Sequence, residues 1–214
     1  MMGKLRYGTS ISLDGFVAGI NQSVENPLGE RGELLHGWLR ELAVWRRDAG
    51  LEGGVTNAST ELYEQSGVST GAIIMGRKMF GGNGPWGDEP WRGWWGEDPP
   101  FHLPVIVLTH QPRDPIVMAG GTSFTFVTTG LQAALNMARE AAQGKDVAIY
   151  GGASVAKQYL AAGLLDELSV SLVPVFLGAG ERLFDEPLNS AVKIEQTRVV
   201  EAPGVTHLRY RVIK

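Results

Sequence analysis

Short apolar runs recur along the chain and set its predicted framework. Each is of strand length and rich in β-branched or other apolar residues, which is typical of buried or half-buried strands. They lie at residues 4–13, 72–75, 105–108, 124–127, 147–150, 168–176, 192–200 and 206–212. The pattern therefore predicts a sheet assembled from segments spread over the whole chain.

Helical spacing of apolar residues separates several of these runs. It predicts helices at residues 34–45, 57–65, 131–142 and 153–162, and a short helix directly after Gly76. In the second of these helices, Asn57 or Ser59 can act as the N-cap. In the last one, apolar residues fall on one face, and Gly163 stands where a C-terminal capping glycine belongs.

The order of these elements predicts an α/β fold. Residues 146–184 form a strand, a glycine turn, a helix and a strand, a unit that is usually built as a parallel crossover. The last two runs are separated by residues 201–204, whose Pro203 and Gly204 favour a hairpin turn. We expect one three-layer α/β domain over residues 1–214, with a mostly parallel central sheet and an antiparallel C-terminal edge.

Two segments have no periodicity. Residues 21–31 are polar, contain glycine and proline, and are predicted to form a surface loop that can close over a site. Residues 83–104 combine glycines, prolines and acids with four tryptophans, namely Trp86, Trp91, Trp94 and Trp95. We expect a packed loop whose indoles cover apolar surface on this chain, on a second copy in a homodimer, or on substrate.

Composition and charge exclude several classes of partner and of functional site. The 214 residues include 19 basic and 23 acidic side chains, a net charge of −4 that gives no reason to expect nucleic acid or a membrane surface as partner. Cysteine is absent, which excludes disulfides, thiolate zinc sites and thiol catalysis. Apolar runs stay well short of the roughly 20 residues of a membrane span, and the start of the chain lacks a signal-peptide core. We expect a cytoplasmic protein with a small-molecule substrate and no metal site.

Candidate ligand-binding residues follow three of the predicted strands. If these strands are parallel neighbours, their carboxyl ends meet in one crevice, where ligands bind in open α/β sheets. The residues in question are Gly76, Arg77 and Lys78 after the second run, Thr109 and His110 after the third, and Gly151 and Gly152 after the fifth.

These residue types suit a phosphate-bearing ligand. Glycines before a helix let a phosphate approach unsatisfied backbone amides at the positive end of the helix dipole. Arg77 can bind phosphate as a fork, and Lys78 as a point charge. Each feature has a plain alternative: a tight turn, two solvated charges, and a loop histidine at residue 110. Their joint placement favours a dinucleotide with an extra phosphate over NAD.

The motifs also resemble a known superfamily. Residues 12–18 (SLDGFVA), 74–78 (IMGRK), 107–110 (VLTH) and 150–155 (YGGASV) occur in the order and spacing of dihydrofolate-reductase-like proteins. The chain is most similar to the reductase domain of the bacterial riboflavin-pathway deaminase-reductase and its stand-alone relatives. Residues 165–168 (LDEL) and 174–180 (PVFLGAG) extend the resemblance over nearly the whole chain.

The resemblance implies a cofactor and a reaction. It implies an NADPH-dependent reductase of a small heterocyclic, imine or carbonyl substrate, similar to 5-amino-6-(5-phosphoribosylamino)uracil reductase. It also implies a cis bond between Gly151 and Gly152. The implied cofactor contacts are Val17 and Ala18 beside the nicotinamide; Gly76, Arg77 and Lys78 at the pyrophosphate and 2′-phosphate; Thr109 and His110 at the adenosine; and Gly151, Gly152, Ala153, Ser154 and Val155 around the pyrophosphate and nicotinamide ribose.

Other functions stay open. Classical folate enzymes carry a carboxylate on the first helix with a phenylalanine four residues later, whereas here Glu30 and Glu33 precede that helix and no such pair exists. A true dihydrofolate reductase, a nucleotide-binding module without catalysis and a structural protein that associates through its tryptophans are the alternatives. For the proton that reduction needs, Asp14 is the predicted positioning group, with a turn-forming role as its alternative and Glu33 as the other candidate.

Overall fold

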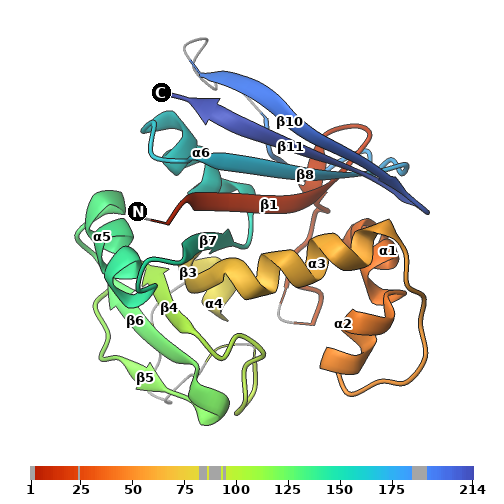
Figure 1. Ribbon diagram of the computed structural model, residues 1–214. Coiled ribbons are helices and arrows are strands. Elements are labelled where there is room, and N and C mark those ends of the chain that lie inside the picture. Colours follow the sequence, from red (N-terminus) through yellow and green to blue (C-terminus); the bar gives the residue numbers. More distant parts are fainter. Residues whose placement is uncertain (1–2, 24, 82–85, 87–92, 94, 185–191) are drawn as a thin grey trace.

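The computed structural model describes residues 3–23, 25–81, 86, 93, 95–184 and 192–214. Within them, a nine-stranded sheet has the order β10-β11-β8-β1-β7-β3-β4-β6-β5 (Figure 1). The strands are β1 (Leu5–Ser12), β3 (Thr70–Gly76), β4 (Pro104–Leu108), β5 (Ile116–Val117), β6 (Ser123–Val127), β7 (Asp146–Tyr150), β8 (Glu167–Val173), β10 (Lys193–Ala202) and β11 (Val205–Ile213).

The predicted fold class is confirmed. Strands β8, β1, β7, β3, β4 and β6 are parallel, whereas β11, β10 and the short β5 join the two edges antiparallel. The predicted crossover is also present, because β7 and β8 both pair in parallel with β1, which lies between them. Strand β1 is therefore an interior strand of the sheet, next to the middle strand β7, although it comes before all the other strands in the sequence.

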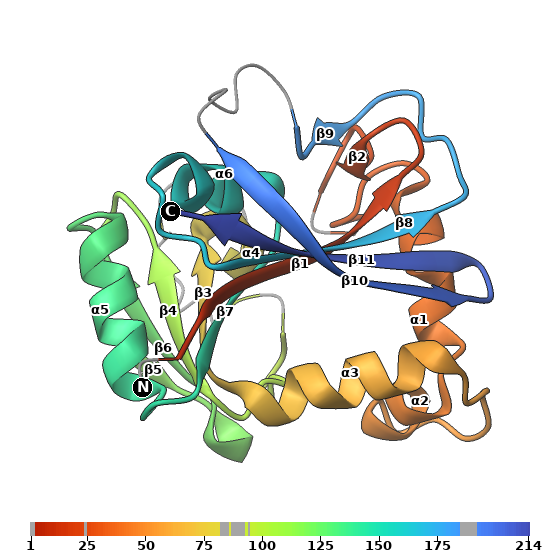
Figure 2. The ribbon, with the colours of Figure 1, turned by 45° about the horizontal axis from the view of Figure 1, so that its top comes forward.

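Helices cover both faces of this sheet. Helices α5 (Leu131–Ala141) and α6 (Ala153–Ala161) pack on one face, where their buried side chains join the largest apolar cluster. Helix α3 (Ala58–Ser69) lies across the other face (Figure 2). Its N-cap is Asn57, whose side chain accepts the Ser59 amide at 2.8 Å, so that the first of the two predicted caps is the right one.

One predicted helix is wrong as a single element. Residues 34–45 form a 3₁₀ turn η1 (Gly32–His36) and the short helices α1 (Gly37–Arg40) and α2 (Ala43–Asp48). Leu42 breaks the run because its backbone is extended (φ −68°, ψ 130°) and forms an isolated bridge with Val55. Since Leu42 is completely buried, burial of its side chain outweighs continuation of the helix.

Strand β5 and three further short elements were not predicted from the apolar pattern. Strands β2 (Phe16–Ala18) and β9 (Glu181–Arg182) form a separate antiparallel pair, visible above the main sheet in Figure 2. The 3₁₀ turn η2 (Ala119–Gly121) precedes β6. Helix α4 (Arg77–Gly81), by contrast, begins where the sequence predicts it.

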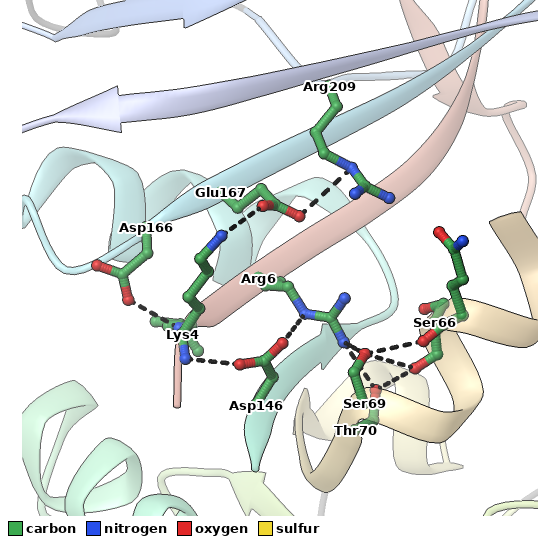
Figure 3. A network of polar contacts seen from close by, with 11 residues as sticks. Lys4, Arg6, Ser66, Ser69, Thr70, Asp146, Asp166, Glu167 and Arg209 are labelled. Carbon is green, nitrogen blue, oxygen red and sulfur yellow. Dashed lines mark hydrogen bonds and ion pairs between the residues drawn. The ribbon is translucent and has the colours of Figure 1, made fainter. Parts of the chain in front are cut away.

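Charged side chains join the amino ends of the central strands (Figure 3). Arg6 of β1 forms an ion pair with Asp146 at 3.1 Å, and its guanidinium donates to the Ser69 hydroxyl at the end of α3 at 2.8 Å. Lys4 reaches Glu167, at the start of β8, at 3.1 Å. These contacts tie β1, β7, β8 and α3 together at the end of the sheet opposite the candidate crevice.

Candidate functional site

The three strands predicted to border the crevice, β7, β3 and β4, are neighbours in the sheet. These three strands are parallel neighbours, with Met75 opposite Tyr150 and Gly76 opposite Leu108. The segments that begin at Gly76, Thr109 and Gly151 therefore emerge side by side at one edge of the sheet. This is the arrangement on which the sequence-based site depends.

The glycine turn is packed on both sides. Gly151 has φ +105°, a conformation that suits glycine, and a Cβ there would lie 2.8 Å from the Met79 Cβ. A Cβ on Gly152 would lie 2.9 Å from Oε2 of Glu181. Gly152 is the N-cap of α6 and makes no side-chain cap, so the first amides of this helix face the turn.

The predicted cis bond between Gly151 and Gly152 is wrong. No peptide bond among the described residues is cis. The chain instead reverses through the positive φ of Gly151, followed by an extended Gly152 (φ −67°, ψ 170°).

Two arginines share one indole beside this turn. The Cζ of Arg77, the first residue of α4, lies 3.7 Å from the Trp86 ring centroid, and the Cζ of Arg113 lies 4.8 Å from it. Burial lowers the pKa of both guanidinium groups, and the Arg113 charge lowers the pKa of Arg77 further. Because two cations this close favour an anion that contacts both, this arginine pair is the part of the crevice best suited to phosphate.

Sequence reasoning missed Arg113. It stands in the loop after β4, the loop that also supplies Thr109 and His110, so its place after a crevice strand was the available signal. Its Nη1 is buried without a hydrogen-bond partner in the part of the chain that the structure describes. Lys78, in contrast, is exposed.

The predicted adenosine-side residues have different surroundings. Thr109 is buried; its amide donates to the Val127 carbonyl at 3.1 Å, and its hydroxyl accepts the Gln111 amide at 3.1 Å. Its hydroxyl therefore shapes the loop. His110 is exposed next to it.

Val17 and Ala18 lie in β2, where both are buried. Ala18 is opposite Glu181 of β9, and Phe16 is opposite Arg182. The Arg182 guanidinium lies 4.2 Å from the Phe16 ring centroid and donates to the Asp14 carbonyl at 2.9 Å. The loop that holds β2 is thus fastened to the segment around β9.

Asp14 helps to make that attachment. Its carboxylate accepts the Leu177 amide at 3.1 Å and the Gly178 amide at 2.7 Å. A hydrogen bond from Ser12 and these amides lower the pKa of Asp14 to about 2. Glu33 is exposed in η1. The part that either carboxylate plays in proton transfer stays a prediction.

We expect the Asp14→Asn variant to lose a pH-dependent part of its stability. Because the pKa of Asp14 falls from 3.8 to about 2 on folding, its contribution is present above pH 3.8 and is lost as the pH falls through about 2. Thermal unfolding of both proteins from neutral to acid pH measures this: their difference should shrink across that window. Glu52→Gln, at an exposed carboxylate, is the control. Parallel curves for wild type and Asp14→Asn would contradict the assignment.

Two tryptophans of the aromatic loop pack on their own chain. Trp86 meets the rings of Phe80 and Phe126 at 5.8 and 5.1 Å, and Trp95 meets Phe101 at 4.9 Å. Self-packing, one of the three alternatives, therefore holds for these two indoles. Trp91 and Trp94 lie outside the described residues.

The hollows, the potential metal ligands and the helices of the described residues do not point to another functional site. Hollows of about 520 and 720 Å³ lie at the amino ends of the strands, among charges such as Lys4, Glu167 and Arg209 that are largely paired with one another. No cluster of three or more potential metal ligands occurs in these residues. None of their helices is long and apolar enough to cross a bilayer.

Comparison with solved structures places the fold among dihydrofolate-reductase-like proteins. Dihydrofolate reductase from Enterococcus faecalis, solved with NADP(H), superimposes with a TM-score of 0.53 at 12% identity, covering 100% of this chain and 99% of that one. The family profile described as the RibD C-terminal domain matches residues 4–208, so the chain belongs to that family.

A curated protein and a further solved structure are also similar to this chain. The chain is 29% identical to the uncharacterized protein YyaP of Bacillus subtilis (strain 168) over 143 residues, which is 64% of this chain and 72% of YyaP. The Thermotoga maritima diaminohydroxyphosphoribosylaminopyrimidine deaminase/5-amino-6-(5-phosphoribosylamino)uracil reductase superimposes with a TM-score of 0.59 at 12% identity. That match covers 99% of this chain but 57% of the Thermotoga protein. At such identities the structural matches define the fold alone.

Proposed function

We propose that this protein is an NADPH-dependent reductase of a small heterocyclic, imine or carbonyl substrate, similar to 5-amino-6-(5-phosphoribosylamino)uracil reductase. The observation that carries the proposal is the arginine pair, Arg77 and Arg113, at the same sheet edge as the glycine turn of residues 151–152. The Thermotoga relative is named for this reductase activity, and the Enterococcus neighbour was solved with NADP(H).

The residues present fit this cofactor. The amides at Gly152 and the start of α6 would bind the pyrophosphate, since no side chain caps this helix. Arg77 and Arg113 would bind the 2′-phosphate, and buried Val17 and Ala18 would pack beside the nicotinamide. The cofactor supplies the hydride, whereas the protein supplies binding, orientation and exclusion of water.

The half-buried position of the arginine pair would make this binding selective for a phosphate. A guanidinium that is partly withdrawn from water gains more from a phosphate than an exposed one does, because less solvent screens the charges. Lys78, Thr109 and His110 would lie at the rim of the same pocket. A nucleotide-binding module without catalysis remains the second candidate, and a homodimer in the cytoplasm remains a proposal beside both.

Titration with NADPH tests the proposal directly. We expect quenching of tryptophan fluorescence with a dissociation constant at or below tens of micromolar (about 6–7 kcal/mol of binding free energy), because the chain holds six tryptophans and Trp86 touches Arg77. Oxidation of NADPH would then be followed with pyrimidine, pterin and carbonyl substrates. The absence of binding would exclude the reductase and the module together, and binding without turnover of any substrate would favour the module.

A further inference from the structure

Helix α3 lies on the sheet without joining its apolar core. Of its twelve described residues only Ser59 is buried, and none of the twelve belongs to the three clusters of buried apolar side chains. A hollow of about 520 Å³ lies between the second half of α3 and the side chains of Arg6 and Arg209 on the sheet. Burial of an apolar face is what usually holds a helix in a protein. Helix α3 is therefore held by contacts of another kind.

Polar contacts fasten α3 near both of its ends. At the carboxyl end, the Arg6 guanidinium of β1 donates to the Ser69 hydroxyl at 2.8 Å (Figure 3). At the amino end, the Ser59 hydroxyl lies 2.8 Å from Nε2 of His207 on β11. Arg198 of β10 adds an exposed contact between these two points. A helix fastened in this way, chiefly at its ends, is called a strap below.

The contact at the amino end of α3 is part of a network that crosses three strands. Nδ1 of His207 lies 2.9 Å from the Ser171 hydroxyl of β8, so each ring nitrogen has a serine partner. The Trp38 indole of α1 stands edge-on to the imidazole, with 4.8 Å between the ring centroids, and donates to the Ser10 hydroxyl of β1 at 3.2 Å. A neutral imidazole fits this arrangement, because one serine can donate to its bare nitrogen while the other accepts from its N–H.

We propose that α3 is a strap that opens as a unit while the sheet stays folded, and that His207 is its latch. In the closed state, the contact between Ser59 and His207 holds the amino end of α3 on the sheet. In the open state, α3 leaves the polar face of the sheet and the imidazole becomes fully accessible to water. These two states depend on how α3 packs and not on the proposed function.

Acid should release the latch. Burial lowers the pKa of His207 from its ordinary value of 6.5. The closed state is therefore favoured above pH 6.5, and it loses stability relative to the open state as the pH falls below 6.5 towards the pKa of the closed state.

The surroundings of His207 offer little to stabilise an imidazolium. Helix α1 presents the Trp38 indole to it. The titratable side chains on the same faces of the other elements, given by the strand registers and the helical spacing from Ser59, are Arg209 of β11, Glu167 of β8, Arg198 of β10 and Tyr63 of α3. Glu167 is paired with Arg209 at 3.5 Å, so its charge is already compensated. A proton on His207 thus adds a cation to a site without a free carboxylate among these groups.

Hydrogen exchange of the whole chain at pH 7.5, followed by mass spectrometry, tests the strap. Ser59→Ala should lower the protection of residues 62–69 by about tenfold, the effect of one lost buried hydrogen bond, and leave β1 and β7 unchanged. Alanine favours a helix more than serine does, so a weaker helix propensity cannot explain this result. Ser66→Ala, at an exposed serine of the same helix, is the matched control and should resemble wild type.

The pH dependence of the exchange tests the latch. After correction for the intrinsic exchange rate, the protection of residues 62–69 should fall in wild type between pH 7.5 and about 5.5, the range that spans an ordinary histidine pKa. His207→Phe keeps an aromatic ring beside Trp38 but has no titrating nitrogen, so it should lack this fall. Thermal unfolding checks that each variant is folded, and His207→Gln takes the place of His207→Phe if the latter does not fold.

Two results would overturn the two parts of the proposal. Equal protection in Ser59→Ala and Ser66→Ala, or a loss that extends to β1 and β7, would mean that α3 does not open as a separate unit. A fall with pH that persists without the imidazole would mean that His207 is not the latch. Nucleotide binding enters neither measurement, so the reductase proposal stands or fails separately.

Discussion

Replacement of both Arg77 and Arg113 by alanine should weaken NADPH binding by about a hundredfold or more and leave NADH binding almost unchanged. Each charge-assisted contact to a phosphate contributes roughly 1.5–3 kcal/mol, and each 1.4 kcal/mol is about tenfold in affinity. NADH lacks the 2′-phosphate, so it has no corresponding contacts to lose. Fluorescence titration with both nucleotides gives the two ratios directly.

Single substitutions distinguish the contributions of the two arginines to NADPH binding. Arg77→Ala and Arg113→Ala should each lose part of the preference for NADPH over NADH. Arg→Lys at either position should keep more of this preference than Arg→Ala but less than wild type, because an ammonium cannot bind a phosphate as a fork. Lys78→Ala, at an exposed side chain, is the control and should change the preference least. An equal loss for NADPH and NADH would mean that the pair contacts the pyrophosphate instead.

Phe80→Ala should lower the free energy of unfolding by about 3–5 kcal/mol, the usual range for a large aromatic residue removed from a core. Phe80 is completely buried, and its ring meets those of Phe124 and Phe126 at 5.0 and 5.1 Å. Urea unfolding with wild type as reference measures the loss.

The Phe80→Ala substitution should also disturb the arginine pair of the candidate site. The Phe80 ring supports Trp86 at 5.8 Å and lies 5.9 Å from the Arg113 guanidinium, so its loss loosens the surface that carries the arginine pair. Phe176→Ala is the matched control, because Phe176 is 64% exposed and its loss should change stability by less than about 0.5 kcal/mol. Similar losses for the two variants would contradict the central place of Phe80 in this cluster.

The apolar pattern was sufficient to predict the strands that build the crevice. Strands β3, β4 and β7 are buried on both faces, and such strands appear as continuous apolar runs with clear ends. Since the candidate residues follow those ends directly, Gly76, Arg77 and Gly151 could be expected at one edge of the sheet if the three strands were parallel neighbours. The prediction of one helix at residues 34–45 was wrong because a contact outside this segment decides its local structure. Its apolar positions fit a helix, but Leu42 forms a bridge with Val55.

Contacts between segments far apart in the chain could not be predicted. Arg113 meets Arg77 only through the packing of Trp86, and Glu181 reaches Gly152 only because β9 pairs with β2. Asp14 illustrates the same limit: the sequence offered a turn residue or a group for catalysis, and the structure adds its hydrogen bonds to the amides of residues 177 and 178. Local sequence carries no signal for such tertiary neighbours.

The place of β1 in the sheet also bears on how the chain folds during synthesis. Leu5 pairs with Val147 and Ser12 with Val173, so β1 leaves the ribosome well before the two strands that flank it in the sheet. Contacts of such high contact order close slowly, and unpaired strands are exposed to aggregation in the meantime. The glycine turn becomes part of a finished sheet only after β8 has been made. A nascent chain that stops short of β8 should therefore depend on chaperones and be unable to complete the proposed nucleotide site.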